Sequence, residues 1–288
     1  MHTDSQRPTR RSVVPHILHK LDQRRFLGFP IWEFSFRSLP RLYGRIFVRD
    51  IILRHPLRTL KGMLAYRRLS WQGQQEKDIT HLYAGTKADL RDEIIEAGDV
   101  LVVALGFCQK PLGAPSMGCP AGRFNHECHV LNRDDILEAQ VERFPPACRD
   151  CDVRLISTIA LQAGAVVYIM TSAADIVRHL FIPTLADDRF RYGLFLQCSY
   201  SIPAMILPLL VCRIQAMLAR YGTGDCRDYD QFLLADEGTK DECTLLNPEA
   251  HARILGFLQD VAAARQVQGQ HYDHFHRDGC LYVPAVEN

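Results

Sequence analysis

The chain has 288 residues, of which 47% are hydrophobic and 23% are charged, with a formal net charge of +1 and ten cysteines. This composition excludes a largely disordered or fibrous protein, and the length suits one large domain or a domain with an attachment. The apolar runs are too short to span a bilayer, and the opening "MHTDSQRPTRRSVVPH" lacks the apolar segment of a signal peptide. We therefore expect a cytoplasmic protein. In that reducing compartment, cysteines indicate metal binding or redox chemistry in preference to structural disulfides.

The first 70 residues are strongly basic. They hold fifteen Lys and Arg against four Asp and Glu, a net charge of +11, whereas the rest of the chain carries −10. Two amphipathic helices are predicted here, over 40–55 and 56–70, the second beginning at Pro56. We assign residues 1–75 to a basic helical arm. Such an arm packs on the acidic body of its own chain, or contacts an acidic protein or the inner face of a membrane.

An alternation of helices and apolar strands begins near residue 80. The predicted strands cover 99–107, 165–172 and 192–200. The predicted helices cover 88–98, 151–164, 173–182, 202–222 and 248–266. Short, uniformly apolar strands between helices are typical of a parallel sheet covered on both faces. The predicted fold class is α/β, with a doubly wound, Rossmann-like, mostly parallel sheet over residues 76–265 and a C-terminal tail over 266–288.

Reactive side chains follow three of the predicted strands. Cys108 comes directly after the first strand, Thr171 and Ser172 end the second, and Cys198 lies near the end of the third. In a sheet of this kind, binding sites form beyond the carboxyl ends of the strands. We expect Cys108 and Cys198 to face a small-molecule pocket as catalytic thiols. Thr171 and Ser172, at the start of a helix, are candidates to hold an anionic group or form an ordinary N-cap.

Five of the ten cysteines fall within residues 106–151, among glycines and prolines. The pair in "PPACRDC" precedes a predicted helix, whose N-terminus lowers thiol pKa values, and Cys119 is followed by proline, as cluster ligands often are. Sets of thiolates favour zinc or iron–sulfur clusters. The predicted metal ligands are Cys119, Cys128, Cys148 and Cys151. We favour a 4Fe-4S cluster, because zinc ribbons usually show two C-x-x-C pairs and this chain shows one.

Other assignments of the same residues stay open. The four cysteines are also consistent with structural zinc, and Cys148 with Cys151 could form a catalytic dithiol. His126 and His129 are further potential ligands, and the choice among Cys108, Cys198 and Cys226 for the site is not decided. The turn "DYDQFLLADEGTKDE", with Asp236 and Lys240, is typical of a solvated acidic surface, with proton transfer as the alternative.

Four segments within roughly residues 95–215 carry a family resemblance: "ALGFC" at the end of a strand, "PPACRDC" before a helix, and the strands "GAVVYIMTS" and "LFLQCSY". In these the chain resembles the cysteine-rich proteins grouped as domain-of-unknown-function family 116. The resemblance implies a metal-binding α/β protein and assigns no reaction. The chain has "TSAAD" where paired glycines are expected after the middle strand, and its basic arm has no counterpart.

The sequence thus predicts an iron–sulfur protein, acting as a redox or biosynthetic enzyme, an oxidoreductase or lyase, or as an accessory. Its expected partners are a small-molecule substrate or a redox partner protein, with peripheral membrane or acidic-protein contact through residues 1–70. No nucleic-acid partner is expected, because the basic helices carry no recognisable motif for reading a nucleic-acid sequence. The alternatives are a zinc-stabilised, non-catalytic adaptor that docks through its basic arm, and a C-x-x-C thiol oxidoreductase.

Overall fold

A computed structural model describes residues 10–72, 75–76, 78–97, 101–113, 117–132, 141–272 and 274–285. Residues 1–9 of the predicted arm lie outside the described residues. Among the described residues, helices and strands alternate along most of the chain, and the fold is α/β with a mixed central sheet.

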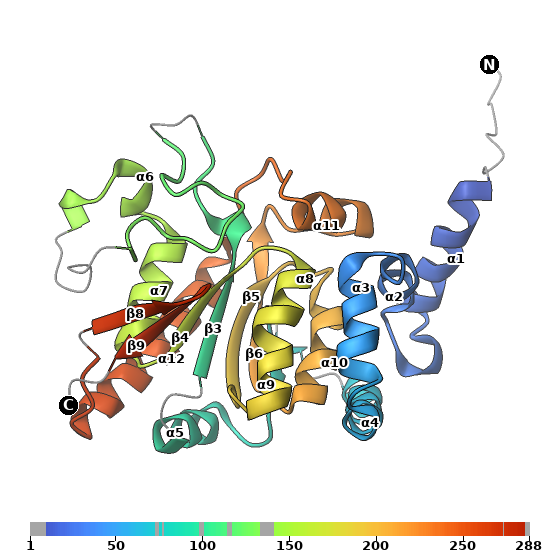
Figure 1. Cartoon of the computed structure of the whole chain (residues 1–288), viewed down its shortest axis with the longest axis horizontal. Coiled ribbons are helices and arrows are strands. Elements are labelled where there is room, and N and C mark those ends of the chain that lie inside the picture. Colours follow the sequence, from blue (N-terminus) through green and yellow to red (C-terminus); the bar gives the residue numbers. More distant parts are fainter. Residues whose placement is uncertain are drawn as a thin grey trace.

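The sheet has parallel strands at its centre and antiparallel strands on both sides (Figure 1). Its order is β1-β2-β6-β5-β3-β4-β9-β8, with β7 paired to β6. The neighbours β4, β3, β5 and β6 run parallel. For β3, β4 and β5 this agrees with the prediction from their uniformly apolar sequences. The strands are β1 (Gln75–Glu76), β2 (Ile79–Leu82), β3 (Leu101–Gly106), β4 (Val166–Met170), β5 (Tyr192–Gln197), β6 (Gln215–Thr223), β7 (Leu245–Leu246), β8 (His274–Asp278) and β9 (Leu281–Ala285).

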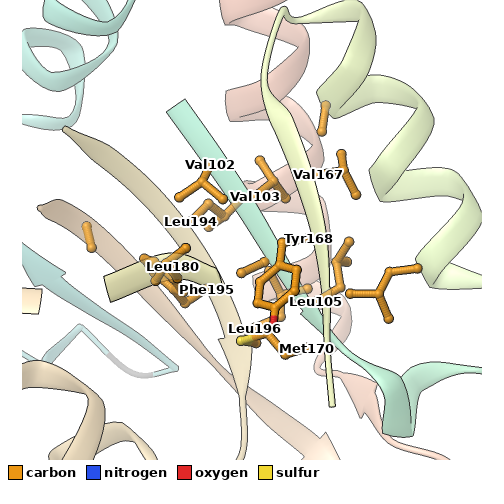
Figure 2. Close-up of a cluster of buried hydrophobic side chains, with 14 of the residues drawn as sticks. Val102, Val103, Leu105, Val167, Tyr168, Met170, Leu180, Leu194, Phe195 and Leu196 are labelled. Atoms are coloured by element: carbon orange, nitrogen blue, oxygen red, sulfur yellow. The ribbon is translucent and has the colours of Figure 1, made fainter. Parts of the chain in front are cut away.

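The core lies on the central strands. Every residue of β3, β4 and β5 is buried, and Figure 2 shows Val103, Val167 and Leu194 among the side chains that fill this region. Burial of whole strands on both faces requires helices above and below the sheet. The winding of those helices into two complete layers stays a prediction.

The helices fall into two packing groups. On one side α12 contacts α7 and α5, and on the other α10 contacts α4. The α-helices are α1 (Arg10–Gln23), α2 (Trp32–Ser38), α3 (Leu42–Ile46), α4 (Pro56–Gln72), α5 (Lys87–Ala97), α6 (Pro146–Arg149), α7 (Asp152–Gln162), α8 (Ala173–Ile176), α9 (Ile182–Asp187), α10 (Ile202–Cys212), α11 (Tyr229–Asp236) and α12 (Pro248–Val267). The short 3-10 segments are η1 (Phe26–Gly28), η3 (Phe107–Gln109) and η4 (Val141–Arg143), and the π-helical segments are η2 (Phe47–Ile52) and η5 (Val177–Phe181).

The basic N-terminal helices pack on the α/β core. Tyr43, Ile46 and Ile51 are buried and belong to the same hydrophobic cluster as the central strands. Tyr66 on α4 is 2% exposed and donates its hydroxyl proton to the carbonyl of Pro203 at the start of α10, at 3.1 Å. Figure 1 shows α4 beside α10, which it contacts. These helices therefore form one wall of the core, and the predicted boundary at residue 75 stays a prediction.

One predicted helix is wrong in its second half. The helix expected over 202–222 ends at Cys212, Arg213 takes a left-handed conformation with φ of 61°, and β6 follows. The left-handed residue lets the amides of Arg213 and Ile214 bond the last carbonyls of α10. Helix and strand could not be separated here from the apolar pattern, because both are rich in Leu, Met and Ala.

The C-terminal segment is part of the sheet. In place of a tail, β8 and β9 form a hairpin, and β9 pairs with β4 through Tyr282 and Leu281. Among the described residues, no helix combines the length and the apolar character that crossing a membrane requires.

Candidate functional site

A cavity of about 390 Å³ lies between the N-terminal helices and the ends of β3, β5 and β6. Its walls are mainly apolar and include Phe29, Trp32 and Phe34 from the N-terminal segment. Polar groups in its lining include Gln197, Ser201 and Asp236, together with several thiols. Pockets of this size and composition bind small, largely apolar molecules and orient them with a few polar groups.

Three thiols reach this cavity. Cys108 follows β3, Cys198 follows β5, and Cys226 lies in the loop after β6, and all three are buried. The structure therefore brings Cys108 and Cys198 to one cavity, and it adds Cys226. The hydroxyl of Tyr221 on β6 donates to the carbonyl of Leu196 at 2.6 Å and accepts from the amide of Gly106 at 3.2 Å, which fixes the three strand ends together.

The thiol of Cys226 is the most acidic of the three. A hydrogen bond from Cys198 and one from Lys240, whose Nζ lies 3.1 Å from the Cys226 sulfur, lower the pKa of Cys226 to about 7. The same hydrogen bond, together with burial, raises the pKa of Cys198 well above its ordinary range. Since the thiolate is the reactive form of cysteine, these shifts favour a thiolate at Cys226 and a protonated thiol at Cys198, which makes Cys226 the candidate nucleophile of the cavity. The glycine-bearing turn before Cys226 was the only sign of this in the sequence.

A carboxyl group also faces the cavity. Burial, with smaller contributions from the carboxylates of Asp175 and Glu237, raises the pKa of Asp236 on α11 to about 6, while the backbone amide of Ala173, which donates to Asp236 at 2.6 Å, opposes the rise. A carboxyl group with a pKa near neutrality can give and take protons at physiological pH. Asp236 is thus a candidate acid–base group.

Three of the four predicted metal ligands, Cys119, Cys128 and Cys151, interact with a buried lysine. Lys110 is 1% exposed, and its ammonium group donates to the carbonyls of Gly122 and Asn125 at 3.1 and 2.8 Å and to the side-chain oxygen of Asn125 at 2.6 Å. Burial lowers the pKa of Lys110 to about 8, opposed by the charges of Cys119, Cys128 and Cys151. Lys110 therefore supplies a positive charge amid the thiols.

The four cysteines also influence one another's pKa values. Burial, with smaller contributions from charge on Cys128 and Cys119, raises the pKa of Cys148 to about 11. Burial likewise raises the pKa of Cys151 to about 12, with contributions from Cys128 and Cys148, opposed by backbone amides at the start of α7. The structure therefore brings Cys119, Cys128, Cys148 and Cys151 into one region.

The spacing of the four sulfur atoms can be compared with the spacing that a zinc ion or an iron–sulfur cluster requires. Within the described part of the chain, no three of these four sulfur atoms lie within 4.8 Å of one another. A tetrahedral zinc ion, with zinc–sulfur distances of about 2.3 Å, requires sulfurs about 3.8 Å apart. An iron–sulfur cluster distributes its thiolates over several irons and accepts a wider spacing. The four sulfur atoms of the described chain are thus spaced more widely than the ligands of one zinc ion.

A short segment and an arginine join the cysteine region to the cavity. Cys108 lines the cavity, and Lys110, two residues later, lies among the four other thiols. Arg123 donates to the carbonyl of Cys108 at 3.0 Å and to that of Lys240 at 2.5 Å. The same side chain therefore holds the cysteine-rich loop against both a cavity thiol and the lysine that activates Cys226.

The side chains of Thr171 and Ser172 are hydrogen-bonded to another residue of the chain. Both hydroxyls donate to Oδ2 of Asp175, at 2.7 and 2.8 Å, and Ser172 also accepts from the amide of Asp175 as the N-cap of α8. In this arrangement they orient a carboxylate, and their predicted role in binding an anionic group stays a prediction. Comparisons of the chain with protein-family models, with curated proteins and with solved structures found no match.

Proposed function

We propose that this chain is an iron–sulfur protein that acts on a small, largely apolar molecule held in the cavity. Cys119, Cys128, Cys148 and Cys151 would hold the cluster. The observation that supports the proposal is the proximity of these four thiols, whose charges influence one another's ionisation. The buried ammonium of Lys110 interacts with three of them. The ammonium of Lys110 opposes the rise that burial causes in the pKa of Cys128, and so favours the thiolate, the form that binds metal, at that residue.

An iron–sulfur cluster supplies one-electron transfer when bound. The chain's own residues supply the rest. The apolar walls exclude water from the bound molecule, which strengthens the electrostatic influence of every charged group in the cavity. Cys226 offers a thiolate held by Lys240, Cys108 and Cys198 present protonated thiols beside it, and Asp236 exchanges protons. This combination suits a redox or lyase reaction on a molecule with one polar end.

Metal analysis of the full chain prepared without oxygen tests this proposal. We expect a brown protein with broad visible absorbance, and about four irons and four acid-labile sulfides per chain, as a 4Fe-4S cluster requires. A colourless protein with one zinc per chain, unfolding when a chelator is added, would instead support the zinc-stabilised adaptor.

The thiol oxidoreductase alternative gains less support from the same residues. A catalytic C-x-x-C pair needs a cysteine whose pKa is lowered toward neutrality. Burial instead raises the pKa of Cys148 to about 11 and that of Cys151 to about 12. High pKa values suit thiols that become thiolates only when a metal replaces the proton.

We also propose that the N-terminal helices rest on an anionic membrane surface. Thirteen of the twenty exposed large apolar side chains among the described residues lie between residues 13 and 64. On α4, Leu57, Leu60 and Leu64 form an exposed stripe at helical spacing, with exposed Lys61 and Arg68 on the same face. The excess of positive charge in residues 1–70 complements anionic lipid.

Vesicle sedimentation tests the membrane proposal. The full chain should bind vesicles containing phosphatidylglycerol, more weakly at high salt, and should bind pure phosphatidylcholine poorly. The variant L57E/L60E/L64E should bind at least tenfold more weakly, whereas V267E, which alters a residue 89% exposed at the end of α12, should bind normally. Equal binding by both variants would contradict the proposal. Deleting residues 1–70 is unsuitable, because it removes the buried side chains of Tyr43, Ile46 and Ile51.

A further inference from the structure

Two histidines and an aspartate meet beyond the end of β4. One side-chain ligand atom from each of His126, Asp175 and His179 lies within 4.8 Å of the others, and among the described residues this is the only such group of three. His126 Nε2 is 3.9 Å from Asp175 Oδ2, and the two imidazole rings meet at 5.8 Å with a 72° angle between their planes. Thus a loop after β3 and the helix after β4 deliver nitrogen and oxygen ligands to one point.

The ring of His126 is held in a defined orientation. Its Nδ1 donates to the carbonyl of Ile169 on β4 at 2.7 Å, and its face stacks on Tyr168, labelled in Figure 2, at 5.6 Å and 20°. Because Nδ1 carries the proton, the Nε2 lone pair points toward Asp175. A backbone carbonyl bonded to the other ring nitrogen is the usual support of a metal-binding histidine.

Nε2 of His126 faces oxygen atoms of Thr171 and Asp175. Thr171 Oγ1 lies 3.4 Å from Nε2, but its single proton goes to Asp175 Oδ2, at 2.7 Å. Ser172 donates to the same carboxylate oxygen. Lone pairs directed at one another repel unless a cation lies between them. The two hydroxyls meanwhile fix the carboxylate, as the outer hydrogen bonds of metal sites do.

The third ligand comes from the same helix as the carboxylate. Asp175 and His179 are four residues apart, a spacing that places side chains on one helix face. The π-helical segment η5, which contains His179, begins two residues after Asp175. π-Helical turns inside α-helices are frequent at functional sites, because the extra residue redirects side chains.

We propose that His126, Asp175 and His179 form a binding site for a divalent transition-metal ion of the zinc class, separate from the cysteine sites. Two histidines and a carboxylate are a typical ligand set for zinc with positions left open for water or substrate. Metal–ligand distances of about 2.0–2.2 Å require each side chain to move inward by roughly half an ångström. The proposal does not depend on the iron–sulfur cluster.

Titration with Co²⁺ as a spectroscopic substitute for Zn²⁺ tests the site on the full chain. Nitrogen and oxygen ligands give weak visible bands, whereas thiolate ligands add intense near-ultraviolet bands. We expect one Co²⁺ per chain of the former type, displaced by Zn²⁺ and missing in D175N and H179Q. T171V, which removes one hydrogen bond to Asp175 and keeps the side-chain shape, should weaken binding roughly tenfold.

H129Q is the matched control, because His129 is an exposed histidine of the same loop and should leave binding unchanged. Circular dichroism verifies that each variant is folded. The proposal is overturned if D175N and H179Q, both folded, bind Co²⁺ as the wild type does, or if the wild type shows only thiolate-type bands. In the latter case a proton, rather than a metal ion, lies between His126 and Asp175.

Discussion

Replacing Cys148 and Cys151 together by serine is expected to remove essentially all iron and acid-labile sulfide from protein prepared without oxygen. Serine hydroxyls are poor ligands for iron in such clusters, and two lost thiolates leave only Cys119 and Cys128 to hold the group. The brown colour should disappear with the metal. Iron and sulfide analysis, with visible absorbance, measures the effect.

The matched control is C212S. Cys212 is also buried, but it lies inside α10, where its thiol contacts the carbonyl of Phe181 at 3.8 Å. Its replacement should leave iron and sulfide unchanged. Since a variant lacking two buried thiols could unfold, C119S provides a milder test, because Cys119 is only partly buried. Normal iron content in both C119S and the double variant would contradict the assignment of the ligands.

Replacing Lys240 by methionine is expected to slow alkylation of Cys226 at pH 7 by about tenfold. Lys240 hydrogen-bonds the Cys226 sulfur and lowers the pKa of the thiol, so its loss should raise that pKa by about one unit, which corresponds to tenfold less thiolate. Titratable groups around the thiol are Cys198, Cys108, Asp225 and Lys240. Mass spectrometry of the peptide carrying Cys226, after treatment with a small alkylating agent, measures the rate.

The pH profile makes this test specific. In the wild type the rate should rise with a midpoint near pH 7, and in K240M the midpoint should move to higher pH with the same plateau. K61M, which alters an exposed lysine on α4, should match the wild type. A wild-type midpoint near pH 9, or one that K240M leaves in place, would show that Lys240 does not activate Cys226.

Much of the central fold could be predicted because strands that are buried on both faces have uniformly apolar sequences. Uniformly apolar segments gave β3, β4 and β5, and Gly164, with φ of 70°, ends the helix before β4 as glycine commonly does. The strand β6 was missed because its residues suit a helix equally well, and tertiary pairing with β5 and β2 decides its conformation. The hairpin β8–β9 was missed because its first strand is polar and exposed at the sheet edge.

The candidate site was predicted in part for a topological reason. Parallel strands deliver the residues after them to one edge, and this rule placed Cys108 and Cys198 at a shared cavity. The roles of Cys226 and Lys240 could not be predicted, because they follow from a contact between two residues that are fourteen positions apart in the sequence. The cavity wall formed by Phe29, Trp32 and Phe34 depends on how the N-terminal helices pack, which no local pattern encodes.

Diffraction at the iron absorption edge, from crystals grown without oxygen, tests the central claim most directly. We predict a strong iron anomalous signal within bonding reach of the sulfurs of Cys119, Cys128, Cys148 and Cys151, next to the ammonium of Lys110. The account is contradicted if that position shows no iron signal, if it gives a zinc signal instead, or if the four thiols are turned away into separate apolar surroundings.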